Sequence, residues 1–358
     1  MNRKKINRRS TAGKVLAIFL IVSLCCSTFF MVSTSLFYHF FFTREDRSAA
    51  CPELTYEDMD PAQLPRQLIQ FPSGPEMLSG SLYGTGRRGV IVFAHGFASG
   101  ADNHLTEALY FVQHGWRVLS FDGTGCRSSS GRSQRCLSQM SLDLLAALRY
   151  LASSELSDCP VLLYGHSCGA YAAAMALSSD YPICGAVCLA PFNSPTELMC
   201  YQASRFVGRI AYTQYPYLWL QNQALVGSEG NRTVTSALSQ TSVPVLVVSG
   251  SHDAIVPAAI SPSSHQDEIA NPLVSFLQID DPYRGTHSAL WLTSDAARYR
   301  SEVLDALRLW QAEAGRELTD DEAEAFLASV DRARMFETDE AFMELIHEFF
   351  LQAVRSAS

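Results

Sequence analysis

The sequence predicts an α/β protein with a mostly parallel central sheet covered by helices on both faces. From Val90 onward, short apolar runs alternate with segments of helical periodicity, which is typical of parallel strands joined by crossover helices. The chain has 358 residues, of which 47% are hydrophobic, so it can build one large domain with a full core. A long apolar stretch near the N-terminus is separate from this pattern.

The N-terminal stretch predicts a transmembrane helix. Residues 1–14 are basic and contain no acid, and residues 15–42 carry no formal charge. As a helix, this stretch rises about 1.5 Å per residue and exceeds the roughly 30 Å hydrocarbon core of a bilayer. Positive charge before the span predicts a cytoplasmic segment 1–14 and an extracytoplasmic location for the rest of the chain. The alternative is a signal peptide cleaved near the small residues Ser33 and Ser35, but the length of the span favours an uncleaved anchor.

A linker at 43–65, containing proline and acid, precedes the main domain at 66–313. This domain is expected to open with an antiparallel hairpin of two strands at 66–71 and 77–83. The strands expected after it lie at 89–94, 116–121, 160–163, 183–190, 243–248 and 271–279. A helix is predicted at 138–151 from its apolar spacing.

Two helical additions are expected outside this alternation. The insertion 191–242 is too long for an unstructured loop and predicts a helical cap rich in aromatic residues. Those aromatics form either the apolar wall of a binding pocket or the cap's own core. After a helix at 294–310, the segment 314–358 predicts an acidic helical hairpin docked on the body, opened by a capping box at Thr319–Glu322.

The segment Gly165-His166-Ser167-Cys168-Gly169 lies between an apolar strand and a helix of small apolar residues. A Gly-x-Ser-x-Gly motif in this setting is typical of a nucleophile elbow. Glycine is needed at 165 and 169 because a Cβ there would collide with the neighbouring strand or helix. The turn directs the Ser167 hydroxyl to the N-terminal end of the helix, where a developing anion is favoured.

Two residues downstream complete a predicted Ser-His-Asp triad. Asp253 lies just past the strand at 243–248, where an orienting carboxylate is expected. His287 lies in a glycine-containing loop after the strand at 271–279. The other histidines beyond Asp253 either precede that strand or belong to the terminal helix. We therefore predict Ser167 as nucleophile, His287 as base and Asp253 as the residue that orients the base.

The strand at 89–94 runs into His95-Gly96-Phe97. The loop after such a strand donates one backbone N–H to an oxyanion hole, and the residue after the nucleophile donates the other. We assign these donors to Phe97 and Cys168. His95 is expected to be a structural residue under the site rather than the base.

These motifs together resemble the α/β-hydrolases, in the branch of the monoacylglycerol lipases, serine-aminopeptidase-like hydrolases and bacterial esterases. The resemblance covers roughly residues 66–313. It rests on 95–97, 121–128, 165–169, 250–253 with 256–257, and 285–287. It implies a serine hydrolase with an acyl-enzyme intermediate, acting on a small-molecule ester or acyl substrate.

Composition limits the other functions. The body after residue 14 contains no lysine and many acids, and the whole chain has a formal charge of −9, which disfavours nucleic-acid binding. No metal motif or organic cofactor is indicated, and the sequence does not indicate an oligomeric state. Cys126 and Cys136 are expected to pair if the compartment permits disulfides. The alternatives to an esterase are a serine aminopeptidase-like peptidase, with Glu197 as a candidate amine-binding acid, and a non-catalytic binding protein.

Overall fold

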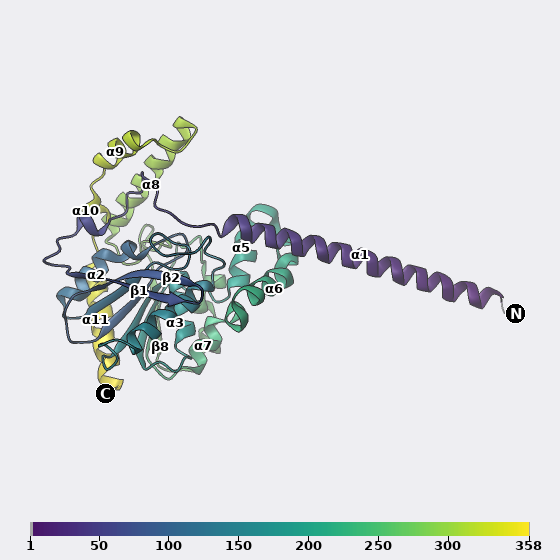
Figure 1. The fold of residues 1–358 in the computed structure, drawn as a ribbon, viewed down its shortest axis with the longest axis horizontal. Coiled ribbons are helices and arrows are strands. Elements are labelled where there is room, and N and C mark those ends of the chain that lie inside the picture. The colour runs from purple at the N-terminus through teal and green to yellow at the C-terminus, as the bar shows by residue number, and fades with distance from the viewer. Residues whose placement is uncertain (1–2, 358) are drawn as a thin grey trace.

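The computed structural model describes residues 3–357, with side chains from residue 11 onward. Met1, Asn2 and the basic side chains before Thr11 in the expected cytoplasmic segment 1–14 therefore lie outside the described residues. The body is built on one eight-stranded sheet, in the order β1-β2-β4-β3-β5-β6-β7-β8 (Figure 1). Its strands are β1 Arg66–Ser73, β2 Glu76–Tyr83, β3 Val90–Ala94, β4 Arg117–Phe121, β5 Val161–His166, β6 Ile183–Leu189, β7 Val245–Gly250 and β8 Val274–Ile279.

The sheet is mostly parallel, as predicted. β1 and β2 form the expected antiparallel hairpin, and β2 is also antiparallel to β4. Every later pairing, from β3–β4 to β7–β8, is parallel. The carboxyl ends of these parallel strands therefore lie at one edge of the sheet, and the loops that follow β3, β5, β7 and β8 meet there.

Helices cover both faces of the sheet (Figure 1). α3 (Gln139–Ala152) and α4 (Cys168–Ala176) contribute to one hydrophobic core, and α2 (Leu105–Gln113) and α11 (Glu340–Ala357) to the other. Consecutive side chains of a strand point to opposite faces. The neighbours Leu163 and Leu162 on β5 accordingly belong to different cores.

The insertion after β6 is helical. Its helices are α5 (Pro195–Val207), α6 (Tyr215–Val226) and α7 (Val234–Gln240), and the 3₁₀ segment Gly208–Gln214 joins the first two. The N-terminal helix α1 (Arg3–Phe41) extends far from the body, and its C-terminal end packs beside α6 (Figure 1). We call the insertion 191–242 the cap.

The C-terminal segment is divided rather than folded as one acidic hairpin. α9 (Asp320–Ala328) packs on α8 (Ser294–Ala314), where Phe326 and Trp310 form an edge-to-face ring pair. α11 instead packs against β6 and α2, with Met343 and Phe350 fully buried. The apolar side of α11 packs on the main sheet, so this helix belongs to the main fold. The acidic composition of 314–358 hid this apolar side in the sequence.

All ten cysteines are free, so the expected pairing of Cys126 with Cys136 is wrong. Both side chains are buried and line the same small cavity, but no bond joins them. Cys136 is part of the core beneath α3, whereas the Cys126 Sγ lies 3.9 Å from the carbonyl oxygen of Thr124.

The close approach of β5 and α4 to β3 depends on glycine. A Cβ on Gly169 would lie 1.8 Å from the carbonyl oxygen of Ala94, and one on Gly165 would lie 2.2 Å from the carbonyl oxygen of Gly169. These neighbours are backbone atoms, so relief requires a shift of β3 or α4.

We expect Gly169→Ala to lower the free energy of unfolding by about 3 kcal/mol or more, because the main chain must move to admit the methyl group. Chemical denaturation followed by circular dichroism measures this change. Gly13→Ala is the control, because a Cβ there meets nothing within 4 Å. An unfolding midpoint for Gly169→Ala equal to that of the wild type would contradict the packing described here.

Candidate active site

Ser167 lies at the turn between β5 and α4. Its backbone has φ 55° and ψ −113°, a conformation that residues other than glycine rarely adopt. The Ser167 N–H donates to the carbonyl oxygen of Leu189 at 2.8 Å, which ties the turn to the end of β6. The strained turn places the Ser167 side chain at the base of a cavity.

The three residues predicted to form a triad lie together. The Ser167 Oγ is 2.9 Å from the His287 Nε2, and the His287 Nδ1 is 2.7 Å from the Asp253 Oδ2. The other Asp253 oxygen, Oδ1, accepts hydrogen bonds from the N–H groups of Ile255 and Val256, each at 2.8 Å. The buried carboxylate thus has partners on both oxygens, so its orientation toward the imidazole is fixed.

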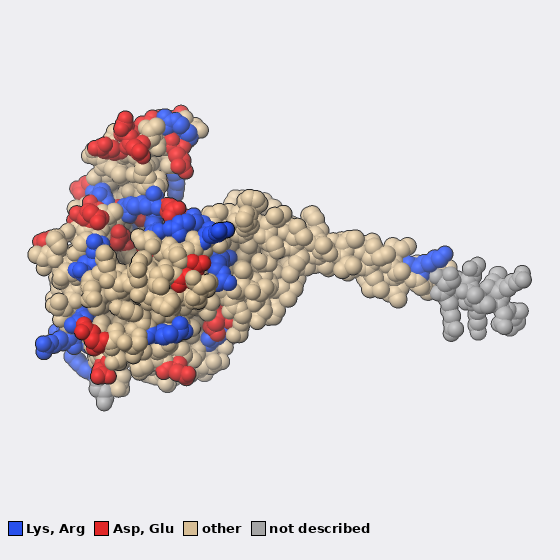
Figure 2. Space-filling model, in the orientation of Figure 1, with Lys and Arg blue, Asp and Glu red and all other residues tan. Residues whose placement is uncertain are grey.

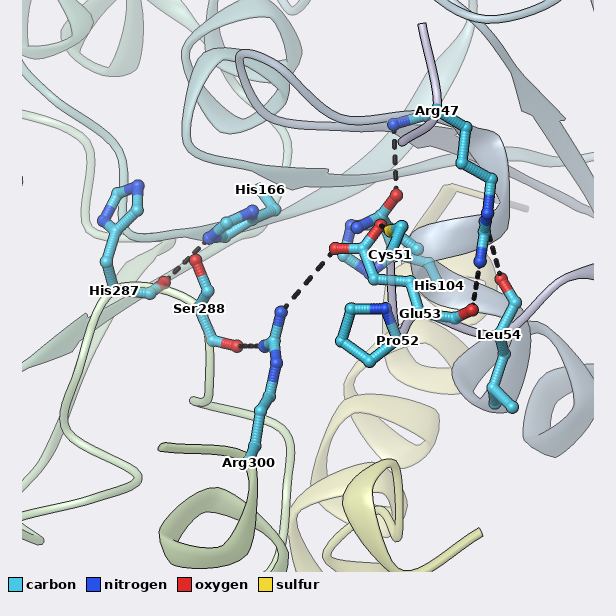
Figure 3. A network of polar contacts seen from close by, with 12 residues as sticks. Arg47, Cys51, Pro52, Glu53, Leu54, His104, His166, His287, Ser288 and Arg300 are labelled. Atoms are coloured by element: carbon cyan, nitrogen blue, oxygen red, sulfur yellow. Dashed lines mark hydrogen bonds and ion pairs between the residues drawn. The ribbon is translucent and has the colours of Figure 1, made fainter. Parts of the chain in front are cut away.

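The loop that carries His287 is held by two further side chains (Figure 3). The buried His166 donates through Nε2 to the carbonyl oxygen of His287 at 2.8 Å. Burial lowers the pKa of His166 well below its usual value, so this ring is neutral. Arg300 donates to the carbonyl oxygen of the next residue, Ser288. The base is therefore supported through its main chain as well as through Asp253.

The two predicted oxyanion donors, Phe97 and Cys168, both line the cavity beside Ser167. Burial raises the pKa of the Cys168 thiol to about 12, while an interaction with the Phe97 N–H partly opposes the rise. The thiol therefore stays protonated and does not compete with Ser167 as a nucleophile.

His95 lies under the site. Its Nδ1 is 2.7 Å from the carbonyl oxygen of Gly96, and its Nε2 accepts a hydrogen bond from the Gly123 N–H at 2.9 Å. Burial lowers its pKa to about 4, so the ring is neutral and bridges two loops. This arrangement fits a structural role.

The cavity above Ser167 has a volume of about 640 Å³ and two chemically different parts. Its apolar part includes Phe37 and Phe41 of α1 and Leu198, Met199 and Phe206 of α5. Of the cap's other aromatics, Phe192 stacks on Tyr171 in the core and Tyr217 lies against Phe30 of α1. The cap's aromatic residues thus serve both the cavity and the packing.

The polar part of the cavity contains Glu53, Asn103 and Arg300. The Glu53 carboxylate lies 3.8 Å from the Arg300 guanidinium group (Figure 3). Its other oxygen lies 3.7 Å from the Arg127 guanidinium group. Glu197, the acid considered from the sequence, is not among the residues that line the cavity.

The sequence did not indicate several residues around this site. Glu53 lies in the linker, and Phe37 and Phe41 lie in the apolar stretch, so no motif marks them. His166 was part of the serine motif, but its support of the His287 loop depends on tertiary contact. Within residues 11–357, no group of three or more His, Cys, Asp or Glu side chains is arranged to hold a metal ion.

Comparisons with known proteins agree with this fold. Residues 85–229 match the family model described as serine aminopeptidase, S33. An esterase of Pyrococcus furiosus superposes with a TM-score of 0.54 at 17% identity, covering 76% of this chain and 97% of that chain. Another crystal form of that esterase gives a TM-score of 0.53 at 16% identity, covering 79% and 98%.

A structure of Est1E from Butyrivibrio proteoclasticus, with ferulic acid bound, is a weaker match. Its TM-score is 0.46 at 15% identity, covering 68% of this chain and 99% of that chain. No curated protein matches the chain in sequence. The eight-stranded sheet, the serine turn after β5 and the superposition on the esterase show that the chain has the α/β-hydrolase fold, and its segment 85–229 is similar to the serine aminopeptidase S33 family.

Proposed function

We propose that the protein is a membrane-anchored serine hydrolase that cleaves carboxylic esters. The observation that carries this proposal is the hydrogen-bond chain from Ser167 through His287 to Asp253 at the base of a largely apolar cavity. His287 takes the proton from Ser167 as the hydroxyl attacks the ester carbonyl, and Asp253 stabilises the resulting imidazolium. The backbone N–H groups of Phe97 and Cys168 stabilise the oxyanion.

The reaction then proceeds in two steps, acylation of Ser167 and hydrolysis of the acyl-enzyme. His287 returns the proton to the leaving alkoxide, which departs as an alcohol and leaves the acyl group on Ser167. Water, deprotonated by the same imidazole, attacks the acyl-enzyme and releases the carboxylic acid. The serine hydroxyl is restored, and no cofactor is consumed.

Ester substrates are favoured over peptides by the cavity. A serine aminopeptidase needs an anionic site for the substrate amine, and the family description makes this the second candidate. Glu53 is the acid that lines the cavity, but its carboxylate is already flanked by Arg127 and Arg300. A cationic amine would therefore meet two positive charges beside Glu53, which disfavours its binding.

A substrate panel tests the proposal on the full chain in detergent. We expect p-nitrophenyl esters to be hydrolysed and aminoacyl-p-nitroanilides to be cleaved far more slowly. A fluorophosphonate probe should label the wild type through Ser167 and leave Ser167→Ala unlabelled. Wild-type protein that is unlabelled and inactive on the whole panel would favour a non-catalytic binding protein, whereas preferential cleavage of the anilides would favour a peptidase.

The anchor is proposed to remain uncleaved, with the N-terminus in the cytoplasm. α1 contains an apolar span at Thr11–Phe41, and its C-terminal part packs on the cap. Tyr38 is buried and donates to the Asn222 side chain at 2.6 Å, and Thr34 donates to the Gln214 side chain at 3.0 Å. Cleavage near Ser33 or Ser35 would detach the span from this packed part.

We expect the intact mass of protein purified from membranes to include residues 1–35. When protease is added to whole cells, the catalytic domain should be digested or should stay attached to the membrane. It should not appear free in the medium. A mature N-terminus near Ser35 would instead establish a cleaved signal peptide.

A further inference from the structure

The opening of the active-site cavity lies where α1 meets the cap. Every exposed side chain that lines the cavity is apolar, and the larger ones are Phe37, Phe41, Phe206, Val207 and Ile255. Phe206 is 89% exposed, which is unusual for a phenylalanine facing water. The polar lining residues, including Glu53 and Arg300, are set deeper. A substrate therefore enters past an apolar rim supplied by α1 and the cap.

The surface around this opening is also apolar. Residues 206–226 contain a single charged residue, Arg209, and expose Ile210, Trp219 and Leu220. On the face seen in Figure 2, charged side chains gather on the body and around α8 and α9, whereas the cap beside α1 is almost free of them. An exposed apolar and aromatic surface continuous with a membrane span is typical of a segment that enters the bilayer interface.

The length of α1 places the opening at a defined depth. The uncharged stretch Val15–Phe42 is about 42 Å long at about 1.5 Å per residue, which equals a bilayer with its headgroups at about 40–45 Å. Lys14 and Arg44 then lie at opposite surfaces. Phe37 and Phe41 then lie near the outer surface of the bilayer, and the part of the cap that packs beside Phe30 and Thr34 lies within the outer leaflet.

We infer that the protein takes a lipid ester directly from the bilayer that holds α1, an inference that rests on the proposed function and anchor. The acyl chain enters the apolar part of the cavity between α1 and α5. The polar headgroup lies at Glu53, Asn103 and Arg300. The cap surface Ile210, Trp219 and Leu220 docks on the same leaflet, so the enzyme reaches its substrate without extracting it into water.

Fluorescence quenching tests the docking without any need for turnover. Trp219 on the cap and Trp310 on α8 are both 41% exposed, which makes them a matched pair. In vesicles of brominated phosphatidylcholine, Trp310→Phe protein, which keeps Trp219, should be quenched clearly more than Trp219→Phe protein. Equal quenching of the two variants would overturn the docked cap.

The second test compares a soluble ester with a membrane ester. The double variant Ile210→Ser/Leu220→Ser changes side chains that are 67% and 45% exposed and do not line the cavity. We expect it to hydrolyse 4-methylumbelliferyl acetate as the wild type does. With 4-methylumbelliferyl oleate in phosphatidylcholine vesicles, it should lose about tenfold in rate, because two apolar side chains no longer enter the bilayer.

The matched control is Leu309→Ser/Leu345→Ser, whose side chains are 63% and 43% exposed on α8 and α11. It should retain both activities. A cap variant that cleaves the vesicle ester at the wild-type rate would overturn the inference while leaving the hydrolase intact. Wild-type protein that cleaves neither ester would instead contradict the proposed function, and the quenching result would still decide whether the cap docks.

Discussion

Replacing Ser167 by alanine is expected to reduce ester turnover by about 10⁴-fold or more, the largest effect predicted for any single residue here. Within residues 11–357, the Ser167 hydroxyl is the only one within hydrogen-bond distance of the His287 Nε2, and the variant loses it. Without it, no acyl-enzyme forms, and hydrolysis depends on water that lacks a fixed position relative to the carbonyl. The kcat for a p-nitrophenyl ester measures the loss.

The Ser167→Ala variant is expected to keep the wild-type fold. Ser167 is 6% exposed, so the removal of one hydroxyl costs little packing. Ser141→Ala provides a matched control, because this serine is also buried but lies on α3 outside the cavity. We expect Ser141→Ala to keep most of its activity and both variants to keep the wild-type circular dichroism spectrum. A Ser167→Ala enzyme with near-normal kcat would remove the basis for the nucleophile assignment.

The main fold was predictable because its signals are local. Apolar runs ending at Phe121 or Val248 identify buried strands, and their alternation with helical patterns predicts a parallel sheet. The placement of Ser167, Asp253 and His287 followed from the same logic, since residues just after parallel strands share one edge. What the sequence supplied was their position in the topology. Their chemical roles stay predictions until the variants are measured.

Other features depend on contacts between distant segments. Phe37 and Phe41 look like any other residues of an apolar span, yet they form a wall of the cavity. Glu53 is one acid in a linker, and only the fold brings it to Arg127 and Arg300. In α11, the acidic composition of the surrounding segment hid the stripe that packs on the sheet. Such features have no fixed spacing that a single sequence could reveal.

Asp253→Asn is expected to reduce kcat by about 10³- to 10⁴-fold while leaving the shape of the site unchanged. The reason lies in the hydrogen bonds that the carboxylate accepts. The N–H groups of Ile255 and Val256 require an oxygen at the Oδ1 position, so an asparagine amide must place its NH₂ group toward His287. The Nδ1 must then accept rather than donate, which moves the ring proton to Nε2. An Nε2–H cannot take the proton from Ser167.

The pH dependence of the rate distinguishes the wrong tautomer of His287 from a general loss of activity. Raising the pH should restore part of the rate of Asp253→Asn, because hydroxide can deprotonate Ser167 without the imidazole. The wild type should gain less from the same rise in pH, because its imidazole already takes the proton from Ser167. Asp267→Asn, an exposed acid away from the cavity, should follow the wild-type profile. If Asp253→Asn instead showed the wild-type pH profile at a uniformly lower rate, the carboxylate would act through charge alone and not by fixing the tautomer of His287.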